Sequence, residues 1–245
     1  MRKPRIYEDS PALTPGITLA LGENGSGHVG RVLRMRPGME LTVFNGTGTD
    51  YDAVIREVTR RAVTVEITSS RQISNESPSP IRLGQVISRG EKMDFTIQKS
   101  VELGVARITP LISRRCGVKL PEDRLDRKQS QWQATAIAAC EQCGRSVLPQ
   151  VDPVTDLEDF LVPDPAWPCI MLHPGAPASL GSADLGTFTG IRLLIGPEGG
   201  LSPEEAALAL EHGCTAASLG PRILRTETAG LVAIAILQSR FGDLG

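Results

Sequence analysis

The stretch Ile191-Arg192-Leu193-Leu194-Ile195-Gly196-Pro197-Glu198-Gly199-Gly200-Leu201-Ser202 decides the fold class of this chain. Its first five residues form a short apolar run, as expected for a strand buried on both faces of a sheet. The glycines that follow permit a tight turn and a close approach of a ligand to the backbone. Ser202 and the Pro-Glu-Glu sequence after it are typical of a helix start. A strand, a glycine-rich turn and a helix in this order predict an α/β sheet that binds its ligand at the carboxyl ends of its strands.

Strands and helices alternate through the remainder of the C-terminal two thirds of the chain. Short apolar runs predict strands at 81–88, 108–112, 169–172, 191–195 and 216–219. Helical periodicity with end signals predicts helices at 94–103, 124–143, 202–212 and 226–239, with Asp94 and Thr226 as N-caps of the first and the last. This alternation predicts a parallel sheet with helices on both faces.

The first 70 residues have a different pattern. Runs with loose alternation of apolar and polar residues predict strands at 39–44, 51–58 and 62–67, and only 28–35 looks helical. This spacing fits a small β barrel. A linker rich in Ser, Asn, Pro and Gln follows at 69–80, so we expect two domains, 1–73 and 74–245.

Composition excludes several classes of protein. With 40% apolar residues among 245, the chain is neither collagen-like nor disordered. It contains no apolar run of about 18 residues, so we expect no transmembrane helix. The basic start, Met1 to Arg5, precedes acidic residues and not an apolar segment, which argues against a signal peptide. Five cysteines make no disulfide framework, and we expect a cytoplasmic protein.

The charge is distributed unevenly although the formal net charge is only −2. Residues 1–81 carry ten Lys or Arg against nine Asp or Glu, and residues 82–145 carry 12 against seven. Residues 146–245 carry four against 12. A polyanionic partner would therefore meet the first two segments, although charge also fluctuates between surface segments without any such partner.

A second cluster, Leu219-Gly220-Pro221-Arg222-Ile223-Leu224-Arg225-Thr226-Glu227, again lies between a predicted strand and a predicted helix. Taken alone, it fits simple helix capping with two surface arginines, and the first cluster fits a plain tight turn. Residues 196–200 are also compatible with a phosphate-binding loop. However, they lack the Walker lysine and do not match G-x-G-x-x-G. Cys140 and Cys143 have the C-x-x-C spacing without a second pair, so we expect no metal site.

Taken together, the two clusters resemble the S-adenosylmethionine (SAM) motifs of the SPOUT methyltransferases. Further segments narrow the resemblance to the 16S ribosomal RNA uridine-1498 N3-methyltransferase family: Met1-Arg2-Lys3-Pro4-Arg5-Ile6-Tyr7, Glu91-Lys92-Met93-Asp94, Glu102-Leu103-Gly104-Val105, Ile108-Thr109-Pro110-Leu111 and Ala139-Cys140-Glu141-Gln142-Cys143-Gly144-Arg145. The resemblance covers nearly the whole chain and is weakest at 146–168. Gly117 and the pair Arg114-Arg115 depart from the family pattern, which puts details of RNA contact in doubt.

The resemblance implies a PUA-like β barrel followed by an α/β SPOUT domain with a trefoil knot, in a homodimer that methylates N3 of a uridine in the small ribosomal subunit. It implies a SAM site made by Leu172, His173, Gly196, Pro197, Glu198, Gly199, Gly200, Leu219, Gly220, Ile223, Leu224 and Thr226. Candidates for RNA contact are Arg2, Arg5, Arg114, Arg115 and Lys119.

Transfer of a methyl group to uracil N3 requires loss of the N3 proton, because the protonated nitrogen is a poor nucleophile. A base or a cation near the developing anion is therefore expected. Arg225 is the first candidate, either for orienting the base or for stabilising that anion, and Glu198 and Glu227 are weaker candidates for accepting the proton. A structural role, as the partner of a backbone amide or an arginine, stays open for each of them. Three alternatives stay open: a non-catalytic RNA-binding protein, a nucleotide hydrolase, and a SPOUT enzyme that modifies another RNA or a ribose hydroxyl.

Overall fold

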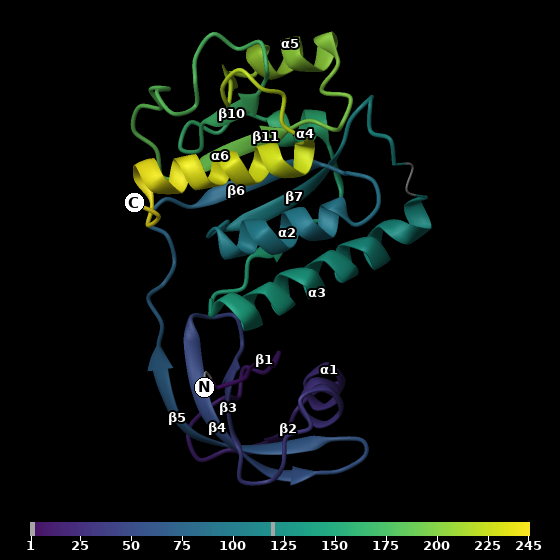
Figure 1. Ribbon diagram of the computed structural model, residues 1–245, viewed down its shortest axis with the longest axis vertical. Helices are drawn as coiled ribbons and strands as arrows, with labels where there is room; N and C mark the ends of the chain where they lie inside the picture. The colour runs from purple at the N-terminus through teal and green to yellow at the C-terminus, as the bar shows by residue number, and fades with distance from the viewer. Residues whose placement is uncertain (1–2, 119–120) are drawn as a thin grey trace. The chain divides into compact units, whose positions relative to one another are not determined.

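The structure, a computed structural model, describes residues 3–118 and 121–245 as a mixed α/β protein. The chain divides into two compact units, one of residues 1–76 and 137–148, the other of residues 77–136 and 149–245 (Figure 1). Helix α3 (Leu125–Cys143) thus contributes its first part to the second unit and its last part to the first. The sequence pattern did not reveal this return of 137–148, and the domain boundary at 73 stays a prediction.

The first unit contains a five-stranded sheet in the order β1-β3-β4-β5-β2. Its strands are β1 (Arg5–Tyr7), β2 (Thr18–Ala20), β3 (Glu40–Phe44), β4 (Thr49–Val58) and β5 (Val63–Gln72). Neighbours are antiparallel except β1 and β3, which are parallel. The three strands predicted from alternation are confirmed, but β5 continues to Gln72, so the linker predicted at 69–80 begins later than expected. Strands β1 and β2, with three residues each, are too short to show a period.

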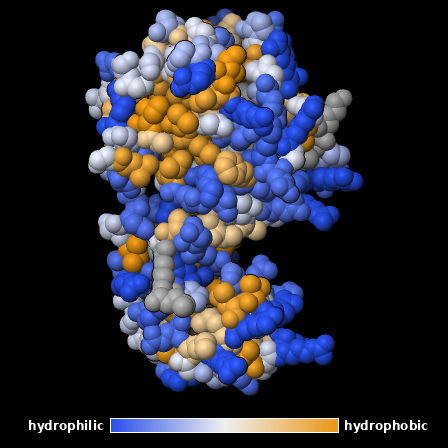
Figure 2. Space-filling model, in the orientation of Figure 1, coloured by the Kyte–Doolittle hydropathy of each residue, from blue (hydrophilic) through white to orange (hydrophobic). Residues whose placement is uncertain are grey.

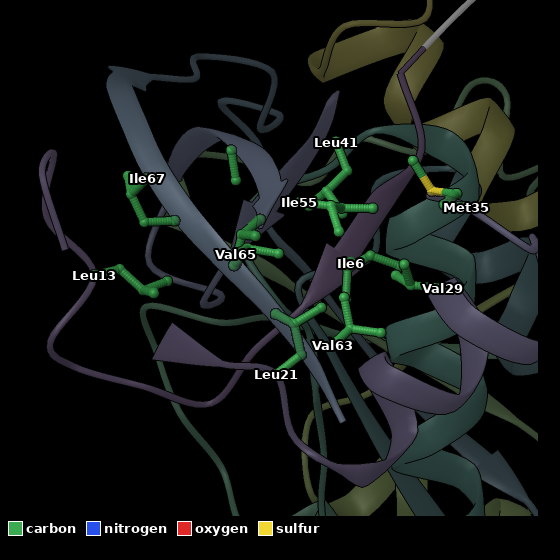
Figure 3. Close-up of a cluster of buried hydrophobic side chains, with 12 residues drawn as sticks. Ile6, Leu13, Leu21, Val29, Met35, Leu41, Ile55, Val63, Val65 and Ile67 are labelled. Atoms are coloured by element: carbon green, nitrogen blue, oxygen red, sulfur yellow. The ribbon is translucent and has the colours of Figure 1, made fainter. Parts of the chain in front are cut away.

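One hydrophobic cluster fills the first unit. Ile6 of β1, Leu41 of β3 and Ile55 of β4 are fully buried, and their side chains meet Val29 from the helical segment (Figure 3). That segment is α1 (Glu23–Gly27), continued by the π-helix η1 (His28–Val32). The helix predicted at 28–35 therefore begins earlier and ends earlier than expected.

The second unit contains a parallel sheet, as predicted, in the order β12-β10-β11-β6-β7-β8, with β9 also pairing with β7. Its strands are β6 (Ile81–Val86), β7 (Arg107–Ile112), β8 (Gln150–Val151), β9 (Thr155–Asp156), β10 (Cys169–Leu172), β11 (Ile191–Ile195) and β12 (Thr215–Ala217). Strands β10 and β11 have the bounds that the sequence predicts. The two-residue strands β8 and β9 carry too little pattern to be predicted.

Helices cover both faces of this sheet. They are α2 (Lys92–Glu102), the first part of α3 after the 3₁₀ turn η2 (Glu122–Arg124), α4 (Leu157–Leu161), α5 (Pro203–Glu211) and α6 (Thr226–Phe241). Leu194 of β11 clusters with Phe160 of α4 and Ala209 of α5. The next residue, Ile195, points to the opposite face, where a Cβ added to Gly230 of α6 would lie 3.7 Å from it. Figure 1 shows α6 and α2 together on that face.

Two predicted helix caps are wrong and one is confirmed. Helix α2 begins at Lys92 with Glu91 as its N-cap, so Asp94 lies in the first turn. Arg225 is the N-cap of α6, and Thr226 is its first residue. Ser202 caps α5 through a capping box, in which its hydroxyl accepts from the Glu205 N–H and Glu205 accepts from the Ser202 N–H. Across the described ranges, no helix is long and apolar enough to cross a membrane.

Candidate active site

A cavity of about 590 Å³ lies in the second unit, at the carboxyl ends of β10, β11 and β12. Three segments supply most of its wall, namely 172–174, 195–201 and 217–226, and Lys92 and Ala229 complete it. The carboxyl ends of parallel strands are where open α/β sheets bind ligands. The position of the cavity therefore follows from the sheet topology that the sequence predicts.

The glycine-rich loop after β11 has two positions that favour glycine. A Cβ on Gly196 would lie 3.1 Å from the backbone nitrogen of Leu201, a contact so tight that the backbone would have to shift. Gly200 has a φ of +68°, which favours glycine. Outside the loop, the Arg115 guanidinium donates to the carbonyl oxygens of Gly199 (3.2 Å) and Leu201 (3.4 Å). Arg115 thus stabilises the shape of this loop from outside.

The loop before α6 forms the opposite wall of the cavity. Gly220 has a φ of +91°, which lets the chain turn sharply after β12. Ile223 lines the cavity and is 84% exposed. An aliphatic side chain so exposed beside a cavity suits a ligand that would cover it. Within the described ranges, the exposed Arg225 side chain makes no hydrogen bond or ion pair, so its guanidinium is available to a ligand.

One buried hydroxyl connects the two loops. Thr226 donates a hydrogen bond of 2.7 Å to the carbonyl oxygen of Gly196 and accepts one of 2.9 Å from the Gln85 side chain. Gln85 also donates to the carbonyl of Val86, at the end of β6. The loop before α6, the loop after β11 and the strand β6 are therefore joined under the floor of the cavity.

Lys92 brings two carboxylates together at the edge of the cavity. Its Nζ lies 3.2 Å from Oε1 of Glu198 and 3.7 Å from Oε2 of Glu227. Burial opposes the ionisation of Glu198, but hydrogen bonds from its own backbone N–H, the Arg89 N–H and Lys92 outweigh it and hold the pKa of Glu198 below its ordinary value. Oε2 of Glu227 is buried and accepts no hydrogen bond among the described residues, so Lys92 supplies its compensating charge.

The sequence-predicted cofactor residues all line this single cavity, and the catalytic candidates Arg225 and Glu198 line it as well. Their contact with a cofactor stays a prediction. Glu227 lies close to Glu198, because both carboxylates contact the ammonium of Lys92. His173 lies in the wall, where its Nδ1 accepts a hydrogen bond from the Gly175 N–H.

Of the residues predicted to contact RNA, Arg5 lies in the first unit, and Arg114 and Arg115 lie in the second. Arg5 is corrected by the structure: its side chain is only 6% exposed and forms a 2.6 Å ion pair with Asp50 inside the first unit, so it presents no charge to a phosphate. Arg114 and Arg115 adjoin the glycine-rich loop, and Arg114 pairs with Glu204 at 3.6 Å. Arg2 and Lys119 lie outside the described residues.

Lys92 and Gln85 were given no role by sequence reasoning. The positions of both residues could have indicated a role. Gln85 lies at the end of β6 and Lys92 at the start of α2, so both lie at the carboxyl end of a central parallel strand. The volume of the cavity and its mixture of apolar side chains and backbone polar groups suit a small organic molecule. Among residues 3–118 and 121–245, no group of three or more His, Cys, Asp or Glu side chains is arranged to hold a metal ion.

Two family models match the chain. The RNA methyltransferase domain matches residues 75–238, and the RNA methyltransferase PUA domain matches residues 22–68. A protein of Buchnera aphidicola subsp. Schizaphis graminum, named ribosomal RNA small subunit methyltransferase E, is 38% identical over 99% of this chain and 98% of its own length.

Two solved structures resemble the whole chain. A structure from Legionella pneumophila, solved in complex with the cofactor SAM, is 42% identical with a TM-score of 0.95 and full coverage of both chains. The ribosomal RNA small subunit methyltransferase E of Neisseria gonorrhoeae, bound to S-adenosylmethionine, is 38% identical with a TM-score of 0.92, again with full coverage of both chains.

Proposed function

The chain belongs to the RNA methyltransferase family that these relatives represent, and from that premise we propose that it methylates N3 of uridine 1498 in 16S ribosomal RNA, with SAM as methyl donor. One observation carries the proposal. Two glycine-bearing loops, 196–200 and 219–226, converge on a single cavity in a chain that matches SAM-bound structures over its full length. The substrate is the small ribosomal subunit or its RNA.

The residues around the cavity fit SAM. Leu172, Ile195, Leu219 and the exposed Ile223 offer apolar surface for an adenine ring. The backbone of the glycine-rich loop and of the loop at Gly220 offers hydrogen-bonding groups to the polar parts of the molecule. Bound SAM would supply an activated methyl group, whose bond to the sulfonium sulfur breaks as the bond to uracil N3 forms.

The chain's own residues handle the proton and charge of uracil. N3 must lose its proton, and the negative charge that develops spreads over the neighbouring carbonyl oxygens. Arg225, with a guanidinium free of partners among the described residues, stabilises that charge. Glu198 is ionised at neutral pH and accepts the proton. N3 lies on the Watson–Crick edge, so the target uridine must be unpaired or extruded to reach these groups.

The finer architecture belongs to the same proposal. Residues 1–73 form a PUA-like RNA-binding barrel, and residues 74–245 form a SPOUT domain with a trefoil knot. The strand order supports the knot, because β12 lies at one end of the sheet while α6, which follows it, packs on β6 and β11 near the middle. The hydrogen bond between Thr226 and Gly196 also supports the knot, because it brings the start of α6 back to the loop after β11.

A homodimer also belongs to the proposal. Leu231, Val232, Ala235 and Ile236 of α6 remain partly exposed. Figure 2 shows an apolar area on the face of the second unit where Figure 1 has α6. An apolar area of this kind is typical of a surface that a second copy covers. The protein acts in the cytoplasm, and its chemistry requires no metal ion.

The experiment is methyl transfer from labelled SAM to small ribosomal subunits that lack the modification, with identification of the product nucleoside by mass spectrometry. We expect N3-methyluridine from the wild type and at least tenfold less from Arg225→Ala, which removes about 1.4 kcal/mol or more of charge stabilisation. Arg56→Ala, which removes an exposed arginine of the first unit, is the matched control and should retain activity. A ribose-methylated product would overturn the N3 assignment, and no RNA product would overturn the substrate.

A further inference from the structure

An exposed group of arginines in the first unit forms no ion pair with any acidic side chain that the structure describes. Arg31, Arg34 and Arg36 lie in and after η1, and Arg60 and Arg61 lie in the turn between β4 and β5. All five are exposed, and within the described ranges none of their guanidinium groups forms a hydrogen bond or ion pair. We call this set the arginine surface. Two acidic side chains of this unit pair with other residues, Glu40 with Lys3 and Glu66 with Arg56, whereas Glu23 and Glu57 form no ion pair within the described ranges.

The two parts of the arginine surface are neighbours in the fold. A Cβ on Gly30 of η1 would lie 3.6 Å from Val63 and 3.7 Å from Val58, the two residues that flank the turn. The hydroxyl of Ser26 accepts from the Val63 N–H and so fixes α1 to the start of β5. The helical segment and the turn therefore present their arginines from the same region of the unit.

The backbone of the helical segment is unusual where the arginines lie. Residues 28–32 form a π-helix, a form that frequently occurs at functional sites. Arg34 has a φ of +51°, a left-handed conformation that is uncommon for residues other than glycine. Strained conformations of this kind persist only where the surrounding structure enforces them.

Apolar side chains lie exposed among these arginines. Val32 is 71% exposed, Met39 46% and Leu33 39%. Solvated charge alone does not account for aliphatic groups exposed in the same short segment. Guanidinium groups bind phosphate oxygens in a bidentate manner and stack on nucleobases, while aliphatic groups contact bases and riboses.

We propose that the arginine surface binds the sugar–phosphate backbone of the substrate RNA, through residues of the first unit that take no part in the methyl-transfer cavity. The inference rests on the proposed function for the identity of the RNA, but its geometry is independent of the methyl-transfer cavity. It replaces the sequence-based expectation that Arg5, which is buried, contacts the phosphates.

The test compares binding of the full chain to unmodified small ribosomal subunits at several salt concentrations. The main variant combines Arg31→Gln, Arg36→Gln, Arg60→Gln and Arg61→Gln, and it leaves Arg34 in place because of its backbone conformation. We expect the Kd to rise at least about tenfold at 0.1 M salt, and the dependence of log K on log salt to become less steep by about 0.7 to 0.9 for each phosphate that the variant no longer neutralises. The SAM affinity and the thermal midpoint should stay unchanged.

Single variants separate a defined site from diffuse charge. Arg60→Gln should weaken binding more than Arg56→Gln, since both remove one charge near the same turn but Arg56 is paired with Glu66. Leu33→Gln should weaken binding without a change in salt dependence. Equal losses from Arg60→Gln and Arg56→Gln, or an unchanged Kd and slope in the fourfold variant, would overturn the proposal.

Three further outcomes are informative. Arginine-dependent binding to vesicles of phosphatidylserine and phosphatidylcholine, with unaltered binding to the ribosomal subunits, would assign the surface to membranes and overturn the RNA proposal. Arginine-dependent binding to the subunits without N3-methyluridine formation would refute the proposed reaction but support the surface. Normal N3-methyluridine formation by the fourfold variant, with wild-type KM for the subunits, would refute only the surface.

Discussion

The hydroxyl of Thr226, the first residue of α6, donates a 2.7 Å hydrogen bond to the carbonyl oxygen of Gly196, the first residue after β11. Thirty residues of sequence separate the two. The bond fixes the distance between the two loops that form opposite walls of the cavity. Because Gln85 donates to the same hydroxyl, the group is buried with both its donor and an acceptor position used.

Thr226→Val should destabilise the fold and, by releasing the two loops from one another, weaken SAM binding. The valine has nearly the same shape, but it leaves the Gly196 carbonyl and the Gln85 amide without their partner, at a cost of about 1 to 3 kcal/mol. We expect the Kd for SAM, measured by isothermal titration calorimetry, to rise about fivefold or more. Thr226→Ser keeps the hydroxyl and should bind normally. Thr228→Val, at an exposed position of the same helix, is the matched control.

Arg115→Ala should also weaken the binding of SAM, and it should leave the binding of RNA nearly unchanged. Its guanidinium donates to two carbonyls of the glycine-rich loop, so the variant releases that loop. We expect a several-fold higher Kd for SAM and little change in the Kd for small ribosomal subunits. Arg115→Lys should restore part of the affinity, because one nitrogen, Nη1, makes both hydrogen bonds and an ammonium can also donate more than once. A loss confined to RNA binding would return Arg115 to the role that the sequence suggested.

Lys92→Met should shift the acid limb of the pH–rate profile to higher pH. In the wild type, the pKa of Glu198 lies below its ordinary value, so the carboxylate is lost only as pH falls through that lowered pKa. Removal of the Lys92 charge raises the pKa of Glu198, and the carboxylate is then lost at a higher pH. Initial rates measured with saturating SAM between pH 4 and 8 (a range of about four units around the expected change) test this. An unshifted acid limb would show that Glu198 does not accept the proton.

Much of the second unit could be predicted from its sequence. The strands at 169–172 and 191–195, the parallel sheet and the cap at Ser202 are local features with strong patterns, and the cavity position follows from them. The predicted N-caps at Asp94 and Thr226 were wrong, since Glu91 and Arg225 hold these positions. The residue type alone does not show whether a side chain caps its own helix or hydrogen-bonds to a distant element. Thr226 is used by Gly196, which local reasoning cannot show.

In the first unit, too, contacts between residues far apart in the sequence could not be predicted. Arg5 follows a basic start and so suggests a surface charge, but Asp50 and Ser146, 45 and 141 residues away, enclose it. Residues 137–148 belong to this unit although they begin within α3, whose first part belongs to the other unit. No periodicity encodes such a return. The arginine surface was likewise overlooked, because its two parts are separate in sequence and meet only through the packing of Gly30 beside Val58 and Val63.

Arg5→Met should destabilise the first unit strongly. Asp50 would remain buried without its main partner, and removal of one member of a buried ion pair costs about 3 to 5 kcal/mol. Burial opposes the ionisation of Asp50, but hydrogen bonds from Arg5, Ser146 and Arg71 prevail and hold the pKa of Asp50 below its ordinary value. Its contribution to stability is therefore complete above the unfolded-state pKa and is lost as pH falls through the lowered folded-state pKa.

Urea denaturation at pH 7 and at pH 3 measures both effects. The wild type should lose stability between the two values, whereas Arg5→Met should be less stable at pH 7 and lose less on acidification, since its Asp50 is no longer held ionised. The double variant Arg5→Met with Asp50→Asn should recover part of the loss at pH 7, because it removes the uncompensated charge. If Arg5→Met instead kept full stability and bound RNA more weakly, Arg5 would bind a phosphate after all.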